Sequence, residues 1–307
     1  MSESPPPSVF IDESAHVIEG EEAEALIRER SEREEVFLKA DSGIAAVDRA
    51  RWEEAQRYER RTWMESGVDL QGDRNRYHQI CLGGYSALRK HHFARAIELG
   101  CGPFTNMRII HECCRIDHMH LLDPLLNDYL RHPYCQYTNG RLGGGKRLLG
   151  DVFRWRDEGR RLLAHPWQLP LALYKALSHG GWKGAEVTLV PSMIEECKAV
   201  AHFDLVVMVN VLEHCQDGHA VLQKILELTT RGSILVFGDL LFDVEKIKQT
   251  HRKLYDVGHP LRIDGTVIRS FLAGNFQELH RCEKRIPRSF HDIELEDNEL
   301  YFIGTRV

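Results

Sequence analysis

Short apolar runs rich in β-branched residues alternate with stretches of helical spacing from residue 94 onward. We expect these runs to be strands, and they cover residues 94–99, 118–122, 185–189, 203–209, 233–237, 276–286 and 300–306. Strands separated by helices form a parallel sheet, because right-handed crossovers place the helices on its faces. Only a polar connection joins the last two runs, which favours an antiparallel pair. The pattern predicts an α/β domain over residues 93–307 with a doubly wound, mostly parallel sheet.

The N-terminal third has a different pattern. Residues 1–40 carry eleven acidic and four basic side chains, which indicates an acidic leader that is disordered or helical. Residues 41–92 show helical spacing over 44–63 and 77–90, and they include the aromatic residues Trp52, Tyr58 and Trp63. These two helices either cover a ligand site as an N-terminal helical cover or pack as ordinary core.

One crossover is much longer than a parallel sheet requires. The insert at 124–184 holds ten basic and four acidic residues, with tyrosine and tryptophan between them. We predict an inserted, basic helical cap. Basic residues interleaved with aromatics are typical of single-strand nucleic-acid binding, and they also suit an anionic small molecule.

Composition limits where the chain can act. The eight cysteines are scattered and form no CxxC pair, which is typical of reduced thiols. No apolar run reaches the length of a membrane span, and the N-terminus has no secretory pattern. We expect a cytoplasmic protein with no membrane partner, and the sequence does not predict an oligomeric state.

A glycine turn follows the first predicted strand. Gly100 and Gly102 allow the backbone to turn sharply and approach a ligand at the carboxyl end of that strand. The dinucleotide pattern GxGxxG is not met, because Thr105 stands at its last position. Asp123 ends the second strand, where an acid can accept hydrogen bonds from two ribose hydroxyls.

Several motifs in series carry a family resemblance. The runs ELGCGP, LLDP, SMIEE, FDLVVMVNVLEH and SILVFGD occur in that order over about residues 94–307. Together they resemble class I S-adenosylmethionine-dependent methyltransferases. The resemblance implies a Rossmann-like sheet with an antiparallel last strand, and S-adenosyl-L-methionine as cofactor, with S-adenosyl-L-homocysteine as product.

The resemblance also implies roles for residues along the edge of the sheet. The glycine turn would shape the methionine side of the cofactor pocket, Asp123 and its neighbours the ribose and adenine, and the turn after the fourth strand the floor beneath the methyl donor. The family often has an Asp near the adenine after the third strand, and Ser192 or backbone groups would take that role here. The cofactor-binding candidates are Glu98, Gly100, Cys101, Gly102, Asp123, Pro124, Leu125, Ser192, Met193, Ile194, Asn210 and Val211.

Two histidines are the catalytic candidates. His214 follows the fourth strand in the motif VLEH, and His259 lies in a His-Pro turn before the last helix. Neutral histidine can remove a proton from an acceptor near pH 7, whereas a structural hydrogen-bonding role is the alternative for each. Ubiquinone-pathway O-methyltransferases, which this motif is similar to, carry an acid three residues before the Glu-His pair and can use magnesium. Asn210 occupies that position, so we predict no metal.

Three functional hypotheses follow. The first is O-methylation of a small-molecule acceptor, possible classes being anionic compounds, sugars and secondary metabolites, with a histidine general base. The second is an RNA or N-directed methyltransferase, which the basic insert favours and the VLEH motif does not. The third is a non-catalytic scaffold that binds S-adenosylmethionine.

Overall fold

The computed structural model describes residues 46–64, 74–132, 135–138, 141–142, 185–198, 202–243, 257–290 and 293–307. It also describes residues 21 and 25 and three short N-terminal strands, β1 (Ser8–Phe10), β2 (Val17–Glu19) and β3 (Phe37–Leu38). The leader predicted over 1–40 and the insert predicted over 124–184 therefore lie largely outside the described residues.

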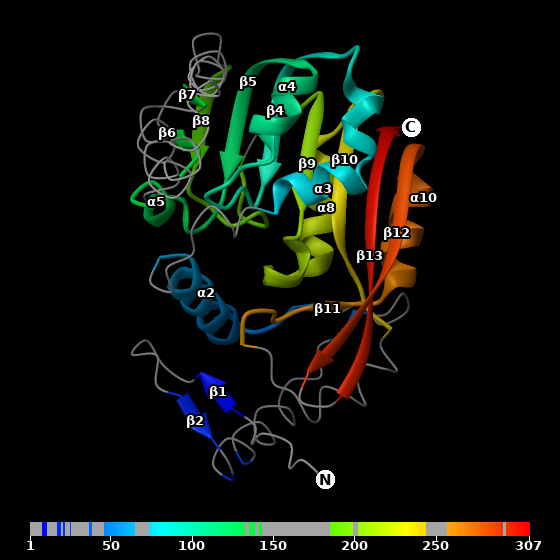
Figure 1. The fold of residues 1–307 in the computed structure, drawn as a ribbon. Helices are drawn as coiled ribbons and strands as arrows, with labels where there is room; N and C mark the ends of the chain where they lie inside the picture. The colour runs from blue at the N-terminus through cyan, green and yellow to red at the C-terminus, as the bar shows by residue number, and fades with distance from the viewer. Residues whose placement is uncertain are drawn as a thin grey trace, which may run out of the picture.

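A seven-stranded sheet forms the centre of the molecule (Figure 1). Its order is β12-β13-β10-β9-β4-β5-β8, and every neighbouring pair is parallel except those that involve β13. This order confirms the predicted doubly wound, Rossmann-like sheet with an antiparallel last strand. The strands are β4 (His92–Leu99), β5 (Arg115–Leu122), β8 (Glu186–Val190), β9 (Leu205–Val209), β10 (Ile234–Leu241), β12 (Phe276–Phe290) and β13 (Ile293–Arg306).

Two apolar layers cover the sheet, one on each face. On the central strand β9 all five residues are buried, and Val206 and Met208 belong to one core while Val207 belongs to the other. Side chains of a strand alternate between faces, so a strand that is apolar throughout must be covered on both sides. The first core includes α8 (Gly218–Leu228) and α10 (Gly265–Asn275), and the second includes α4 (Met107–Cys113).

The described part of residues 41–92 consists of a long helix and a broken one. Helix α2 (Arg49–Met64) begins after Asp48, whose side chain accepts the Arg51 amide at 2.8 Å. It lies beyond the carboxyl ends of the parallel strands (Figure 1), where it contacts the helices that follow β5 and β9. α2 therefore lies at the ligand-binding edge of this kind of sheet.

The single helix predicted over 77–90 is wrong. The chain forms α3 (Asn75–Cys81) and a separate 3-10 segment, η2 (Gly83–Leu88). Gly83, Gly84 and Tyr85 have φ angles of 62°, 64° and 55°. Two consecutive glycines permit this left-handed turn, which an α-helix cannot accommodate.

The remaining described elements are short. They are α5 (Leu126–Tyr129), the hairpin of β6 (Tyr137–Thr138) and β7 (Arg141–Leu142), η4 (Leu212–His214) and β11 (Arg262–Ile263), which pairs with β3. The eight cysteines are all free thiols. Among the described residues, no helix has the length and apolar character needed to cross a bilayer.

Candidate functional site

The glycine turn lies at the carboxyl end of β4 against the turn after β9. Gly100 has a φ of 70°, and a Cβ there would lie 2.5 Å from Val211 Cγ2. Gly102 has a φ of 51° but no atom within 4 Å of its Cβ position. Gly100 therefore permits the close approach of two loops, whereas Gly102 provides an open, left-handed turn. The Tyr137 hydroxyl fixes this turn by donating to the Gly102 carbonyl at 2.9 Å.

Glu98 anchors the glycine turn from inside the protein. Its carboxylate is buried and accepts hydrogen bonds from the Asn106 amide at 2.8 Å and the Asn106 side chain at 3.0 Å. The Thr105 hydroxyl donates to the same carboxylate. Burial raises the Glu98 pKa, while these hydrogen bonds oppose the rise. In this structure Glu98 organises the loop that a ligand would contact.

Asp123 links the ends of the first two strands. Its two carboxylate oxygens accept the amides of Gly102 at 3.1 Å and Leu125 at 2.8 Å. Burial raises the Asp123 pKa to about 7, with smaller contributions from the nearby charges of Glu59 and Glu98. Each oxygen of an ionised carboxylate has further acceptor capacity, so two hydroxyl donors can still be accommodated.

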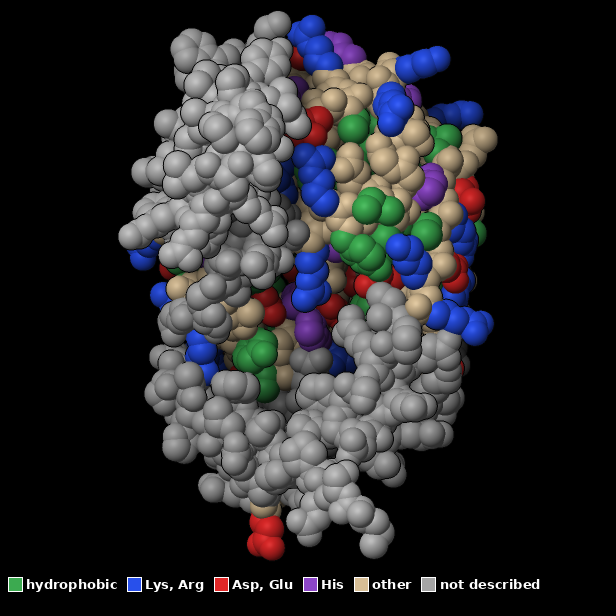
Figure 2. Space-filling model, viewed as in Figure 1, with side chains coloured by type: hydrophobic (Ala, Val, Ile, Leu, Met, Phe, Trp, Pro, Cys, Tyr) green, Lys and Arg blue, Asp and Glu red, His purple; other side chains and the backbone are tan. Residues whose placement is uncertain are grey.

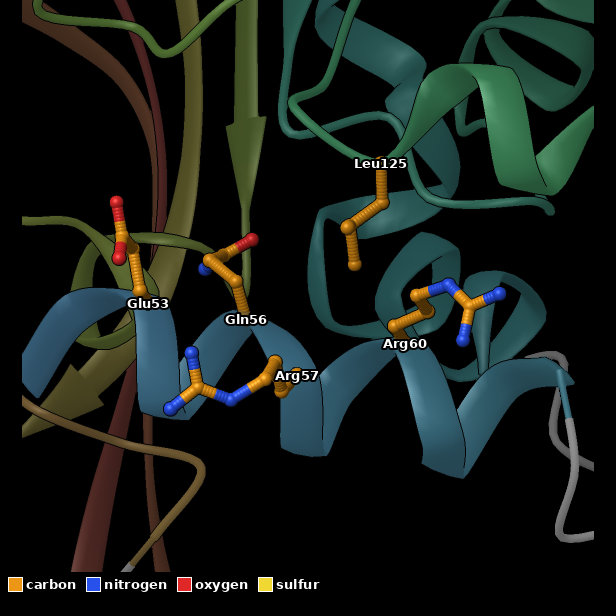
Figure 3. A pocket seen from close by; sticks show the side chains of 5 residues that line it. All are labelled: Glu53, Gln56, Arg57, Arg60 and Leu125. Atoms are coloured by element: carbon orange, nitrogen blue, oxygen red, sulfur yellow. The ribbon is translucent and has the colours of Figure 1, made fainter. Parts of the chain in front are cut away.

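The turn after Asp123 faces helix α2. Pro124 is partly buried, and the Leu125 side chain points toward α2 across an open recess of about 230 Å³ (Figure 3). The residues of α2 that line this recess are polar or charged: Glu53, Gln56, Arg57 and Arg60. The recess is the place where a ligand could lie between α2 and the turn after β5.

The three candidates after β8 divide between surface and core. Ser192 is partly buried, and its hydroxyl donates to the Met193 carbonyl at 3.0 Å. Met193 and Ile194 are buried in the same core as Val211. The Met193 sulfur accepts from the guanidinium of Arg49 at 2.9 Å. The turn after β8 is thereby tied to the start of α2.

A buried carboxylate holds the turn after β9. Asn210 takes a left-handed φ of 60°, which turns the chain at the end of the strand. The next two amides, of Val211 and Leu212, donate to Asp239 at 3.2 Å and 2.7 Å. Burial, followed by the charge of Glu213, raises the pKa of Asp239 to about 7. Asp239 thus positions the backbone that carries Glu213 and His214.

The structure brings the two predicted histidines together. The rings of His214 and His259 lie 4.6 Å apart between centroids, although 45 residues separate them in sequence. His214 Nδ1 lies 3.0 Å from the Gly258 carbonyl oxygen, which fixes the orientation of the ring. The Glu213 carbonyl accepts the Leu261 amide at 3.1 Å. This backbone bond joins the segment that carries His259 to η4.

Two carboxylates complete this histidine cluster. Glu213 Oε1 lies 3.5 Å from His259 Nε2 and 3.9 Å from His214 Nε2. Glu59, on α2, places its Oε1 3.6 Å from His214 Nδ1. Figure 2 shows histidine and acidic side chains gathered near the middle of this face. The cluster combines proton-transfer groups and potential cation ligands at the end of β9.

Sequence reasoning missed three acidic residues of the site. Glu213 and Asp239 stand inside the motifs VLEH and VFGD, so their positions at strand ends were visible signals. Glu59 had no such signal, because it lies on a charged amphipathic helix more than 150 residues from His214. The cofactor and catalytic roles of the named candidates remain predictions.

No protein-family model matches this chain, and no curated protein matches it. The N-methyltransferase NodS from Bradyrhizobium japonicum WM9, solved with S-adenosyl-L-homocysteine, is 12% identical with a TM-score of 0.46, covering 83% of this chain and 98% of NodS. A Burkholderia thailandensis 1,6-didemethyltoxoflavin N1-methyltransferase with S-adenosylhomocysteine is 14% identical with a TM-score of 0.43, covering 88% and 98%. A complex of DhpI with SAM and HEP is 10% identical with a TM-score of 0.45, covering 83% and 99%. At this degree of similarity the fold rests on the strand order described above.

Proposed function

We propose that this chain is an S-adenosylmethionine-dependent methyltransferase that acts on a hydroxyl of a small-molecule acceptor. The observation that carries the proposal is the common location of the predicted residues. The glycine turn, Asp123 and His214 all follow carboxyl ends of parallel strands, Asp123 contacts the glycine turn directly, and His259 lies against His214. Ligands of doubly wound sheets bind at this edge.

The cofactor half of the proposal rests on Asp123 and the two glycines. A buried acid at the end of β5, beside an open Gly102, suits a ribose whose two hydroxyls donate to one carboxylate. Glu98 is occupied by its own loop, so we assign it the shaping of the pocket and no ligand contact. The turn that carries Asn210 and Val211 would form the floor next to the methyl group.

The catalytic half rests on the histidine cluster. Methyl transfer displaces a sulfonium carbon in line, so the protein mainly aligns the acceptor and removes its proton. An imidazole can accept that proton near neutral pH. His214 is 17% exposed and His259 is 32% exposed in their side chains. We propose one of them as the base, and the basic insert favours an anionic acceptor.

The first test measures cofactor binding and turnover separately. Calorimetry with S-adenosylmethionine should give a micromolar-range dissociation constant, and Asp123→Ala should weaken it by at least about tenfold, because two charge-assisted hydrogen bonds are lost. Arg95→Gln, in the middle of β4 and away from its carboxyl end, is the control. Absence of any binding to the wild-type protein would refute the cofactor assignment.

The second test identifies the acceptor and the base. Transfer of a labelled methyl group into a metabolite extract should label small molecules, and label in RNA would favour the nucleic-acid alternative. His214→Ala and His259→Ala should lower turnover by about 100-fold or more if the altered residue is the base, without changing cofactor affinity. Cofactor binding with no transfer to any extract fraction would favour a scaffold.

A further inference from the structure

Four side chains from three separate segments converge at the histidine cluster: Glu59 on α2, Glu213 and His214 on η4, and His259 in the loop before β11. The donor atoms of Glu59, His214 and His259 all lie within 4.8 Å of one another. Glu213 Oε1 lies 3.5 Å from the Nε2 atom of His259 and 3.9 Å from that of His214. Among the described residues no other group of this kind meets the same spacing.

These separations are those of ligands around an ion. A nitrogen and a carboxylate oxygen that share a hydrogen bond lie about 2.7 to 3.2 Å apart. Donors that surround a tetrahedral cation at about 2.0 to 2.1 Å must lie about 3.3 Å apart. The distances of 3.5 and 3.9 Å from Glu213 Oε1 to the Nε2 atoms of His259 and His214 are too long for good hydrogen bonds, and the shorter one is close to the tetrahedral spacing.

Neighbouring groups hold the ligands in place. The Gly258 carbonyl oxygen lies 3.0 Å from His214 Nδ1, and because a carbonyl only accepts, this contact keeps the proton on Nδ1 and directs a lone pair from Nε2. The indole of Trp63 donates to Glu59 Oε2 at 3.1 Å, leaving Oε1 toward His214. Metal-binding histidines and carboxylates are commonly oriented by such outer hydrogen bonds.

The local negative charge also favours a bound cation. The Glu213 side chain is only 4% exposed, and the buried carboxylate of Asp239 holds the same turn. Glu59, at 17% exposure, adds a third carboxylate to the same region. Buried carboxylates are costly unless they are paired or bind a metal.

We propose that Glu59, His214 and His259, with Glu213 as a fourth donor, form a binding site for a divalent transition-metal ion. Two imidazoles with carboxylates favour zinc, manganese, iron or cobalt, whereas magnesium and calcium prefer sites made entirely of oxygen. The prediction of no metal rested on Asn210, which removes one carboxylate from the turn after β9. Glu59 supplies a carboxylate from the cover helix instead, so the site is complete only when α2 is in place.

The metal site is independent of the proposed cofactor, but it bears on the proposed base. A histidine Nε2 that binds a cation cannot also accept a proton. Activity that persists after chelation would therefore assign the histidines to proton transfer in the metal-free protein. Metal binding is measured in the absence of S-adenosylmethionine, so failure of one proposal leaves the other standing.

The experiment titrates the full-length, chelator-treated protein with zinc, cobalt and magnesium chloride in turn. We expect one zinc ion per chain, no comparable magnesium binding, and cobalt absorption bands in the visible range that report nitrogen and oxygen ligands. Glu59→Gln should weaken zinc binding by about tenfold or more, since it removes a charged ligand. Glu53→Gln, an exposed position on the same helix, is the matched control and should bind zinc as the wild-type protein does.

Two results would overturn the proposal. One is the absence of a one-to-one zinc complex in wild-type protein. The other is equal zinc affinity and equal cobalt spectra in Glu59→Gln and Glu53→Gln. If Glu59→Gln fails to fold, the cobalt spectrum of the wild-type protein decides, because a site without histidine ligands would not show the expected nitrogen signature. His259→Gln then serves as the second variant, and an unchanged cobalt spectrum in it would also overturn the assignment.

Discussion

Cofactor affinity should depend on the protonation of Asp123, and this dependence tests the assignment of the ribose site. Burial raises the pKa of Asp123 to about 7 in the ligand-free protein. The ionised carboxylate accepts hydrogen bonds at both of its oxygens, whereas the protonated acid loses part of this capacity. Lowering the pH through 7 therefore weakens binding of a ligand that donates two hydroxyls to this group.

The magnitude follows from the ionised fraction. For a pKa of about 7, roughly nine-tenths of Asp123 is ionised at about pH 8 and roughly one-tenth at about pH 6. If only the ionised form binds well, the dissociation constant for S-adenosylhomocysteine should rise about tenfold between these two pH values, or about 1.4 kcal/mol. Calorimetry at fixed ionic strength measures this change directly.

Asp123→Asn is the control that isolates this group. The variant should bind more weakly than the wild-type protein at high pH and should lose most of the tenfold pH dependence, because it has no carboxylate to titrate at position 123. Any dependence that remains then comes from titration of the ligand itself. An unchanged affinity of the wild-type protein over this range would refute the reasoning. So would an equally steep dependence in Asp123→Asn.

Two further predictions concern the loops that form the site. Gly100→Ala should lower the free energy of unfolding by about 1 to 3 kcal/mol, because the added Cβ would clash with Val211 at a left-handed φ. Gly102→Ala places its Cβ in open space and should lower it by only about 1 kcal/mol, owing to the left-handed φ alone. Urea denaturation of both variants measures the difference. Asp239 should lower stability as the pH rises. Its pKa is raised from 3.8 to about 7 in the folded protein, so folding favours the protonated acid. The stability that this group contributes is fully present below about pH 4 and is lost as the pH rises through 7, a loss of up to about 4 kcal/mol in the free energy of unfolding. Asp239→Asn should flatten the fall in unfolding free energy between about pH 4 and pH 7.5, and an equal slope in both proteins would contradict this.

The strands of the sheet could be predicted because burial on both faces imposes an apolar run. β9 is the clearest case, since all five of its residues are buried and the sequence reads as a continuous apolar segment. The break between α3 and η2 was missed, because helical spacing of apolar residues continues across it while Gly83 and Gly84 adopt left-handed angles. Periodicity reports which residues face the core and does not report a local reversal of φ.

Some residues of the candidate site could likewise be predicted from the sequence, and others could not. Asp123 and His214 were found because they follow strands, and parallel strands place their carboxyl ends at one edge. The contact between His214 and His259 was not derivable, since it depends on a loop bond from Leu261 to the Glu213 carbonyl. The place of Glu59 depends on where α2 docks, and docking is decided by tertiary contacts that local spacing does not contain.

Helix α2 is docked by different kinds of contact along its length. Near the histidine cluster, the buried guanidinium of Arg51 donates to the Val257 carbonyl at 2.8 Å, and Gln56 donates to the His214 carbonyl at 3.3 Å. Near β5, the helix is tied by the exposed pair of Arg60 and Asp128 at 3.2 Å. A charge-assisted bond in a buried setting stabilises more than an exposed ion pair, which contributes about 0 to 1 kcal/mol.

The C-terminal end of α2 is also held by Trp63, whose ring packs edge-on against Phe104 and Tyr129, and the open recess beside Leu125 is lined by helix residues between Glu53 and Arg60. The recess and the histidine cluster are therefore linked through a single helix, because Gln56 lines the recess and donates to the His214 carbonyl, and Glu59 of the cluster directly precedes Arg60.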